Sequence, residues 1–495
     1  MPDGRLLYSR WDYVDRNGVL YQHLWTARPD GGGVRIYYGN NTWNPCGTWE
    51  ARPIPGSTKV MAISGPHHAM AAGSVVLIDT LKGIDGTVPT LRITPDVRFI
   101  ESEEPLAHAP KFVKDIAPDF IPEKFWYGGI LDPERNTTPT EGERRWPGHC
   151  FKSPSPLSEA YFLASYSFDR LLGEPGGNLP NQFGIYICGT NGLRELIYRD
   201  PRISSLWARP VAVRELPPLA HSSIDPERAA RGTGTFALDN VAEAWPKALP
   251  ADRPITALRI FHVITKTTPN KDQPRMGAGS GSIGREILGT VPVEKDGSAY
   301  FEAPAKTPIY FQALDAKGRA VQTMRSLVYL QPGERESCVG CHEDRRSSYA
   351  PARASQALKR PPSAIVPEKV PGAKPFNYLK MVQPILNNRC VSCHDGTKKG
   401  CPSLKDDKEG WACKSFNVLV KHVSYSGWGK QPNNNYEPLT VPLTFGALAS
   451  PLLKRLEAGH GGVKLTDEEM YRMILWMDSN GACWGTYDVD KQREL

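Results

Sequence analysis

One five-residue pattern occurs twice in the C-terminal part of the chain, as CVGCH at residues 338–342 and CVSCH at residues 390–394. Two thiols separated by two residues can each bond to a vinyl group of a haem, and the histidine that follows then lies beside the iron as an axial ligand. A zinc knuckle or a redox-active thiol pair also uses C-x-x-C, but a thioredoxin-like pair needs a βαβ setting that neither motif has. The repetition predicts two covalently bound c-type haems, attached through the four motif cysteines: Cys338, Cys341, Cys390 and Cys393.

The second haem has a well-placed candidate for its other axial ligand. His394 supplies one side, and only His422 and His460 follow it in the chain. His460 lies in the glycine-flanked loop LEAGHGGVKLT, directly before the last expected helix, where a small cytochrome usually presents its distal ligand. We therefore predict bis-histidine ligation by His394 and His460, which allows electron transfer only, with His422 as the alternative.

The first haem has no comparable partner, because no histidine follows His342 closely. Upstream candidates are three histidines: His23, His67 and His68. If none of them binds, the first haem is five-coordinate and open to a small nitrogen or oxygen compound. Tyr349 and Arg345 then become the candidate catalytic residues, the tyrosine as a possible axial group and the arginine as a group that orients an anion.

Composition excludes some classes of protein. A chain of 495 residues is too long for one ordinary core, so we expect two to four domains, and 45 glycines with 45 prolines indicate a turn-rich, mainly β protein. The net charge of +7 is spread along the chain without a basic block, which gives no case for nucleic acid but leaves room for an acidic redox partner. No apolar run reaches about 18 residues, so no integral membrane segment is expected.

The N-terminal sequence MPDGRLLYSRWDYVDR lacks the apolar core of a signal peptide. Covalent haem is attached outside the cytoplasm. We therefore expect an exported protein, in the periplasm or an equivalent compartment, whose signal segment is missing from this chain. In such an oxidising compartment, Cys401 and Cys413 can close a short loop as a disulfide.

The pattern of strands and turns predicts three domains. Residues 1–215 repeat short strands joined by turns rich in Asp, Asn and Gly, such as PDGGG, which favours about three β-propeller blades. Three blades are too few to close a propeller, so we expect either an N-terminally truncated propeller or closure by later sequence. Residues 103–150 form a Pro-rich insertion, expected to be a long loop. Residues 216–370 predict a β-rich middle domain of the sandwich type that carries the first haem, with hairpin turns at KDGS and DAKGR.

Residues 371–495 change to a helical pattern and predict a cytochrome c-like domain that carries the second haem. The segment YLKMVQPILNNRCVSCH leads a helix into the second motif. In LTDEEMYRMILWMDSNG the apolar residues recur at helical spacing, Thr466 and Glu469 form a capping box, and Met470 and Met473 are expected in the core. The fold class is therefore mainly β with a C-terminal α domain.

Several segments resemble the hydrazine synthase alpha-subunit-like family of multidomain dihaem cytochromes: LYSRWDYVDR, GTVPVEKDGSAYFEAPA, YFQALDAKGRAVQTMRS, QPGERESCVGCHEDR and GHGGVKLTDEE. The resemblance spans most of the chain. It implies a propeller, a middle β domain with the first haem and a C-terminal cytochrome domain with the second. It also implies a zinc site beside the first haem, formed by Asp15, Cys150 and His342.

The chain departs from this family at one position. In hydrazine synthase a tyrosine one helical turn after the first motif ligates the iron, but here Arg346 stands in that place and Tyr349 is the nearest tyrosine. Ordinary ligation by His342 therefore stays open.

Two function hypotheses remain, with a scaffold that carries incidental haems a distant third. The first is a hydrazine synthase-like haem oxidoreductase, in which a substrate meets the first haem and electrons pass through the second. The alternative is a non-catalytic electron-transfer cytochrome whose propeller docks a partner protein. Both hypotheses imply a redox partner or other subunits.

Overall fold

The structure is a computed structural model that describes residues 1–12, 14–16, 21–42, 47–65, 72–97, 149–168, 183–219, 222, 224–245, 247–342, 355–427 and 440–494. These residues are mainly β, with a few short helices and no closed barrel among them. They form two compact units. Unit 1 contains Met1–Asp12, Gly18–Ser222 and Tyr436–Pro438, and unit 2 contains Tyr13–Asn17, Ser223–Asn435 and Leu439–Leu495. The division into three domains stays a prediction.

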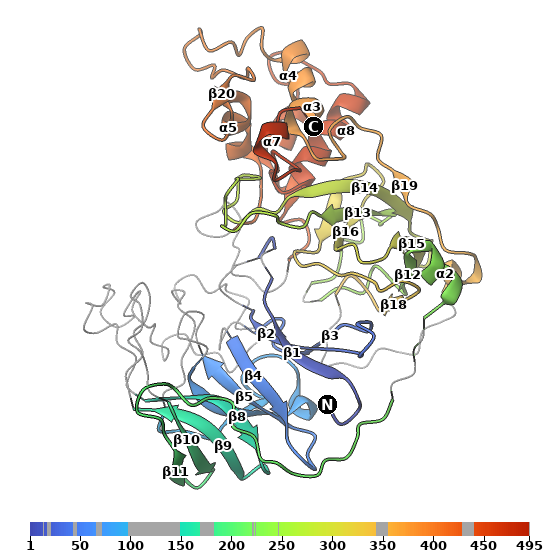
Figure 1. Cartoon of the computed structure of the whole chain (residues 1–495). Coiled ribbons are helices and arrows are strands. Elements are labelled where there is room, and N and C mark those ends of the chain that lie inside the picture. Colours follow the sequence, from blue (N-terminus) through green and yellow to red (C-terminus); the bar gives the residue numbers. More distant parts are fainter. Residues whose placement is uncertain are drawn as a thin grey trace. The chain divides into compact units, whose positions relative to one another are not determined.

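Unit 1 contains three consecutive antiparallel sheets (Figure 1). Their strands, in spatial order, are β1 (Leu6–Arg10), β2 (His23–Ala27) and β3 (Arg35–Tyr38); β4 (Gly47–Pro53), β5 (Val60–Gly65), β6 (Ser74–Ile78) and β7 (Thr90–Arg92); and β11 (Arg194–Tyr198), β10 (Gly184–Gly189), β9 (Tyr161–Ser167) and β8 (Cys150–Pro156). The PDGGG turn joins β2 to β3 as expected, and the Arg28 N–H donates to the Gly32 carbonyl at 2.8 Å.

Each sheet of unit 1 has its strands in chain order, as propeller blades do. The two four-stranded sheets share an apolar core that includes Ile63 and Val75 from one sheet and Phe151 and Phe162 from the other. Closure of the sheets into a propeller stays a prediction. The expected long loop at residues 103–150 lies almost entirely outside the described residues.

Unit 2 begins with two sheets that pack on a common core. The three-stranded sheet has the order β15 (Ala299–Pro304), β12 (Thr233–Leu238), β18 (Arg335–Cys338), and the five-stranded sheet has the order β17 (Ala320–Thr323), β16 (Ile309–Leu314), β13 (Ala257–Val263), β14 (Arg285–Pro292), β19 (Val366–Pro367). Phe236 and Phe301 of the first sheet meet Ile260 and Val291 of the second in this core. Before β12 stands the short helix α2 (Pro226–Arg231), which the sequence did not predict.

Of the two hairpin turns predicted in unit 2, one is confirmed and the other is wrong. DAKGR joins β16 to β17 within one sheet, and the Asp315 N–H donates to the Arg319 carbonyl at 3.0 Å. KDGS also forms a tight turn, in which the Glu294 N–H donates to the Ser298 carbonyl at 2.8 Å. However, its strands β14 and β15 belong to different sheets, so this turn joins two layers and the hairpin prediction is wrong.

The C-terminal part of unit 2 is helical as expected, in short pieces: α3 (Tyr378–Met381), α4 (Gln383–Arg389), α5 (Lys414–Leu419), α6 (Gly446–Ala449), α7 (Pro451–Glu457) and α8 (Asp467–Asp478), with a small hairpin of β20 (Lys408–Glu409) and β21 (Ala412–Cys413). The predicted single helix before the second motif is two helices, because Pro384 stands in the first turn of α4 and cannot continue α3. The capping box of Thr466 and Glu469 on α8 is confirmed.

One apolar core joins these helices to the five-stranded sheet. It includes Phe261 and Tyr310 from the sheet and Phe416, Trp476 and Trp484 from the helical part. In Figure 1 the helices gather on one side of β14, β13 and β16. The segments that carry the two C-x-x-C-H motifs therefore belong to one compact unit.

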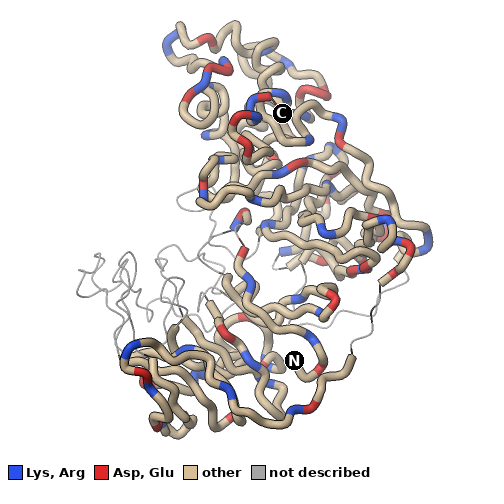
Figure 2. Tube along the Cα trace, viewed as in Figure 1, with Lys and Arg blue, Asp and Glu red and all other residues tan. Residues whose placement is uncertain are grey.

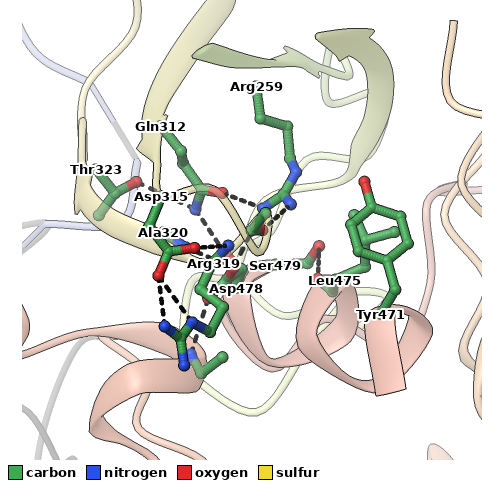
Figure 3. A network of polar contacts seen from close by, with 12 residues as sticks. Arg259, Gln312, Asp315, Arg319, Ala320, Thr323, Tyr471, Leu475, Asp478 and Ser479 are labelled. Carbon is green, nitrogen blue, oxygen red and sulfur yellow. Dashed lines mark hydrogen bonds and ion pairs between the residues drawn. The ribbon is translucent and has the colours of Figure 1, made fainter. Parts of the chain in front are cut away.

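A buried polar network reinforces this junction (Figure 3). Arg259 of β13 and Asp478 at the end of α8 are both fully buried and form an ion pair at 3.2 Å. Arg259 also donates to the Gln312 side chain at 3.0 Å and to the Gly318 carbonyl at 2.6 Å. The Gln312 amide in turn donates to the Asp478 carbonyl at 2.7 Å. The network thus ties the sheet to the last helix by direct contacts.

Lys and Arg are interspersed with Asp and Glu along the described residues of both units (Figure 2). In the part of the chain that the structure describes, no helix has the length and apolarity needed to cross a bilayer.

Candidate functional site

The second motif continues a helix. α4 ends at Arg389, after which the Cys390 N–H donates to the Leu386 carbonyl at 2.8 Å and the His394 N–H donates to the Cys390 carbonyl at 2.9 Å. The Cys390 side chain is half-buried and Cys393 is exposed. A helical turn therefore presents both thiols and the imidazole from one short segment.

A hydrogen bond fixes the tautomer of His394. Its Nδ1 lies 3.1 Å from the carbonyl oxygen of Pro402. Because a carbonyl only accepts, Nδ1 carries the proton and donates, which leaves Nε2 unprotonated and able to bind a metal. Such a contact to the outer nitrogen is the usual support of a metal-bound histidine.

His460 faces this imidazole, and the joint ligation of a haem iron by the two rings stays a prediction. The ring centroids of His394 and His460 lie 6.0 Å apart, with an angle of 37° between the ring planes. Two metal–nitrogen bonds of about 2 Å each, with about 1 Å more from each nitrogen to its ring centre, require about 6 Å. The spacing therefore fits one iron held between the two rings.

The glycines beside His460 give its loop a tight turn. Gly459, Gly461 and Gly462 have φ values of +75°, +60° and +81°, a backbone region that favours glycine. The Val463 N–H donates to the His460 carbonyl at 3.1 Å and closes the turn. Here the local sequence alone was sufficient to identify the candidate ligand.

Helix α8 contacts α4, the helix that leads into the second motif. Glu469 of α8 accepts a hydrogen bond at 2.9 Å from Arg389, the last residue of α4. Met473 is buried in the core as expected, and Met470 is partly buried against it. These contacts set the distance between the start of α8 and the His394 segment.

The first motif has a different backbone. Cys338 ends strand β18, which runs parallel to β12 with Leu238 opposite Cys338. The pairing continues past the strand, because the Asn240 N–H donates to the Val339 carbonyl at 2.9 Å and the Trp245 N–H donates to the His342 carbonyl at 2.8 Å. The first motif therefore begins at a strand end and continues through bends, whereas the second motif forms a helical turn.

The side chains of the first motif are also suited to covalent attachment. Cys338 and Cys341 are half-buried at the edge of the core between the two sheets. Burial, with a smaller effect from Cys338, raises the pKa of the Cys341 thiol to about 12. Both thiols of the first motif therefore lie against the apolar core between the two sheets.

The predicted zinc ligands have other surroundings in this structure. Both carboxylate oxygens of Asp15 accept from the Arg285 guanidinium, at 2.9 and 3.0 Å, and both side chains are buried. Cys150 is buried in unit 1, beside Phe183. Within the described ranges no three His, Cys, Asp or Glu side chains are close enough together to hold a metal ion.

Several other candidates cannot be compared with the structure. Tyr349, Arg345, His67 and His68 all lie outside the described residues. His23 is fully buried, and its ring nitrogens contact the Thr48 hydroxyl at 3.2 Å and the Thr42 carbonyl at 3.1 Å, so its ring is part of the core of unit 1.

Sequence reasoning missed two contacts of the site and suggested one bond that is not formed. Pro402 and Trp245 carry no motif, and only the fold brings them to the histidines. Cys401 and Cys413 are not bonded to each other. Cys413 lies in the core, 3.3 Å from the Ser415 hydroxyl.

Comparisons show which known proteins this chain is similar to. A protein-family model described as "Hydrazine synthase alpha subunit middle domain" matches residues 254–343. Hydrazine synthase subunit alpha of Kuenenia stuttgartiensis is 24% identical over a 450-residue alignment that covers 68% of this chain and 54% of the relative, so the chain spans about half the length of that protein. The solved structure of Kuenenia stuttgartiensis hydrazine synthase has a similar fold, with a TM-score of 0.66, 18% identity and coverage of 98% of this chain and 68% of the other.

Proposed function

Because this chain belongs to the hydrazine synthase alpha-like family, we propose that it is a dihaem c-type cytochrome that acts as a redox enzyme subunit. The first haem is open to a small nitrogen or oxygen compound, and the second transfers electrons. The observation that supports this most strongly is the 6.0 Å spacing of the His394 and His460 rings.

Each residue set has a separate task in this proposal. When bound, haem supplies an iron that exchanges single electrons. His394 and His460 would hold the haem iron at the second motif between their rings, which would leave no place for a substrate there. At the first motif His342 would hold the iron from one side and leave the other side for the substrate. Tyr349 is the candidate for an axial group there, and Arg345 is the candidate to orient an anion.

The proposal includes the finer architecture. The sheets of unit 1 are propeller blades, and the helices around the second motif are a cytochrome c-like domain. Export to the periplasm or an equivalent compartment follows from covalent haem attachment. The alpha-subunit relative suggests that this chain also assembles with other subunits.

Haem content and spectra test the central claim. Acid-acetone extraction should leave the haem on the purified protein, and mass analysis should show two haem additions. The spectrum should contain one low-spin and one high-spin species, and carbon monoxide should bind one haem per reduced chain. Two low-spin haems that bind no carbon monoxide would instead support the non-catalytic electron-transfer cytochrome.

A pair of histidine variants tests the ligand assignment. His460→Ala should convert the low-spin species to high-spin and should shift its potential, because an axial position opens. His422→Ala is the matched control and should leave both species unchanged. If His460→Ala left the low-spin species intact, His460 would not be the ligand.

A further inference from the structure

The two motifs differ by one internal residue, and the structure gives the reason. Gly340 of the first motif is buried, and a Cβ atom there would lie only 2.1 Å from the carbonyl oxygen of Glu243. Ser392 occupies the same place in the second motif and is exposed. The first motif therefore requires glycine because another segment of backbone lies against it.

That segment is residues 239–245, here called the flanking segment. It follows β12 and stays beside the motif along its whole length. The Asp239 N–H donates to the Cys338 carbonyl at 3.0 Å, and the Trp245 N–H donates to the His342 carbonyl at 2.8 Å. The hydrogen bonds fix the motif backbone from its first cysteine to its histidine.

The flanking segment also contacts the histidine ring. The indole of Trp245 stacks on the imidazole of His342, with ring centroids 6.0 Å apart and ring planes 26° apart. Stacking of this kind resists rotation of the smaller ring out of its plane. At the second motif the Pro402 carbonyl orients His394 instead, and the ring that faces His394 at 6.0 Å is the imidazole of His460.

We propose that Trp245 is a positioning residue that sets the plane of the His342 imidazole at the first haem. This inference rests on the proposed function, because it assumes that haem is attached at the first motif. The supporting contacts are the indole–imidazole stack and the backbone hydrogen bond between the same two residues. Both contacts orient the imidazole of His342 independently of any bound group, as the outer contacts of a metal-bound histidine do.

The test uses the purified protein with both haems attached and reads electron paramagnetic resonance spectra and midpoint potentials. Trp245→Ala should shift and broaden the signals of the first haem and shift its potential. The signals of the second haem serve as an internal control and should stay unchanged. Trp245→Phe retains a flat ring and should restore most of the original signal.

Exchange of the internal motif residue gives a matched pair of variants. Gly340→Ser makes the first motif identical to the second and should perturb the first haem, because the added atoms meet the Glu243 carbonyl. Ser392→Gly makes the second motif identical to the first and should have little effect on either haem. This pair keeps the test informative if Trp245→Ala does not fold.

The outcomes separate this inference from the proposed function. A wild-type protein with fewer than two haems would refute the proposed function. Two haems in the wild type, with the spectra and potential of the first haem unchanged in Trp245→Ala, would refute only the positioning role. If Trp245→Ala does not fold, an unchanged first haem in Gly340→Ser would refute it in the same way. A lower unfolding temperature with an unchanged first-haem signal would show that Trp245 serves stability alone.

Discussion

The buried pair of Arg259 and Asp478 should be essential for the junction between the five-stranded sheet and helix α8 (Figure 3). Burial raises the pKa of the Asp478 carboxyl, while Arg259 and two backbone N–H groups act in the opposite direction. One oxygen accepts from the Ala447 N–H at 2.8 Å, and the other accepts from the Ala320 N–H at 2.9 Å and from Arg259 at 3.2 Å. We therefore choose Asp478→Asn, which keeps the shape and removes the charge.

The cost of this change has two parts. Arg259 would remain buried without its carboxylate, and removal of one partner of a buried pair costs about 3–5 kcal/mol. The new amide group has only one oxygen, so its NH₂ must face the Ala320 or the Ala447 N–H, and an unsatisfied buried donor costs about 1–3 kcal/mol. The parts share atoms and do not add. We expect a loss of about 4 kcal/mol in the free energy of unfolding of unit 2.

Urea unfolding followed by circular dichroism measures this loss. With a slope of about 3 kcal/mol per M, the midpoint should fall by more than about 1 M. Glu468→Gln on the same helix is the matched control, because the Glu468 side chain is 77% exposed and its contact with Arg472 is long, at 4.0 Å. It should change the free energy by less than about 0.5 kcal/mol. Equal losses in the two variants, or a loss below about 1 kcal/mol in Asp478→Asn, would refute the reasoning.

Three further predictions concern other contacts of unit 2. Glu469→Ala removes half of the capping box and the contact with Arg389, so thermal unfolding should show a loss of about 1 kcal/mol; no loss would mean that the contacts are dispensable. Asp15→Asn leaves Arg285 buried without its carboxylate and should cost about 3–5 kcal/mol in urea unfolding without changing metal content, whereas a loss of bound zinc would favour the zinc site. The hydrogen bond with His262 lowers the pKa of Glu286 in the folded protein, so ionised Glu286 stabilises the fold at a pH above its ordinary pKa of about 4.3, and this stabilisation is lost as the pH falls through the lower folded-state pKa. His262→Phe should reduce this loss of stability in acid, as measured by the free energy of unfolding against pH. An unchanged pH profile would contradict the prediction.

The sequence by itself determined the features that depend on neighbouring residues. The capping box needs only Thr466 and its partner three residues later, and the PDGGG turn needs only glycines that accept a left-handed backbone. The tight loop around His460 also depends only on neighbouring residues, because the glycines beside His460 accept a left-handed backbone. Two identical cysteine spacings likewise indicate covalent haem without knowledge of the fold.

Only the tertiary structure decided what depends on segments far apart in the chain. Near-identical motifs became a strand end and a helical turn, because residues 239–245 lie against Gly340 whereas Ser392 faces solvent. Asp15 lies beside Arg285, which stands 270 positions later, and no local pattern indicates that a carboxylate will meet a guanidinium rather than a metal. Burial decides such pairs, because a buried charge is stable only beside an opposite charge, and the packing of the core determines which charged residue lies there.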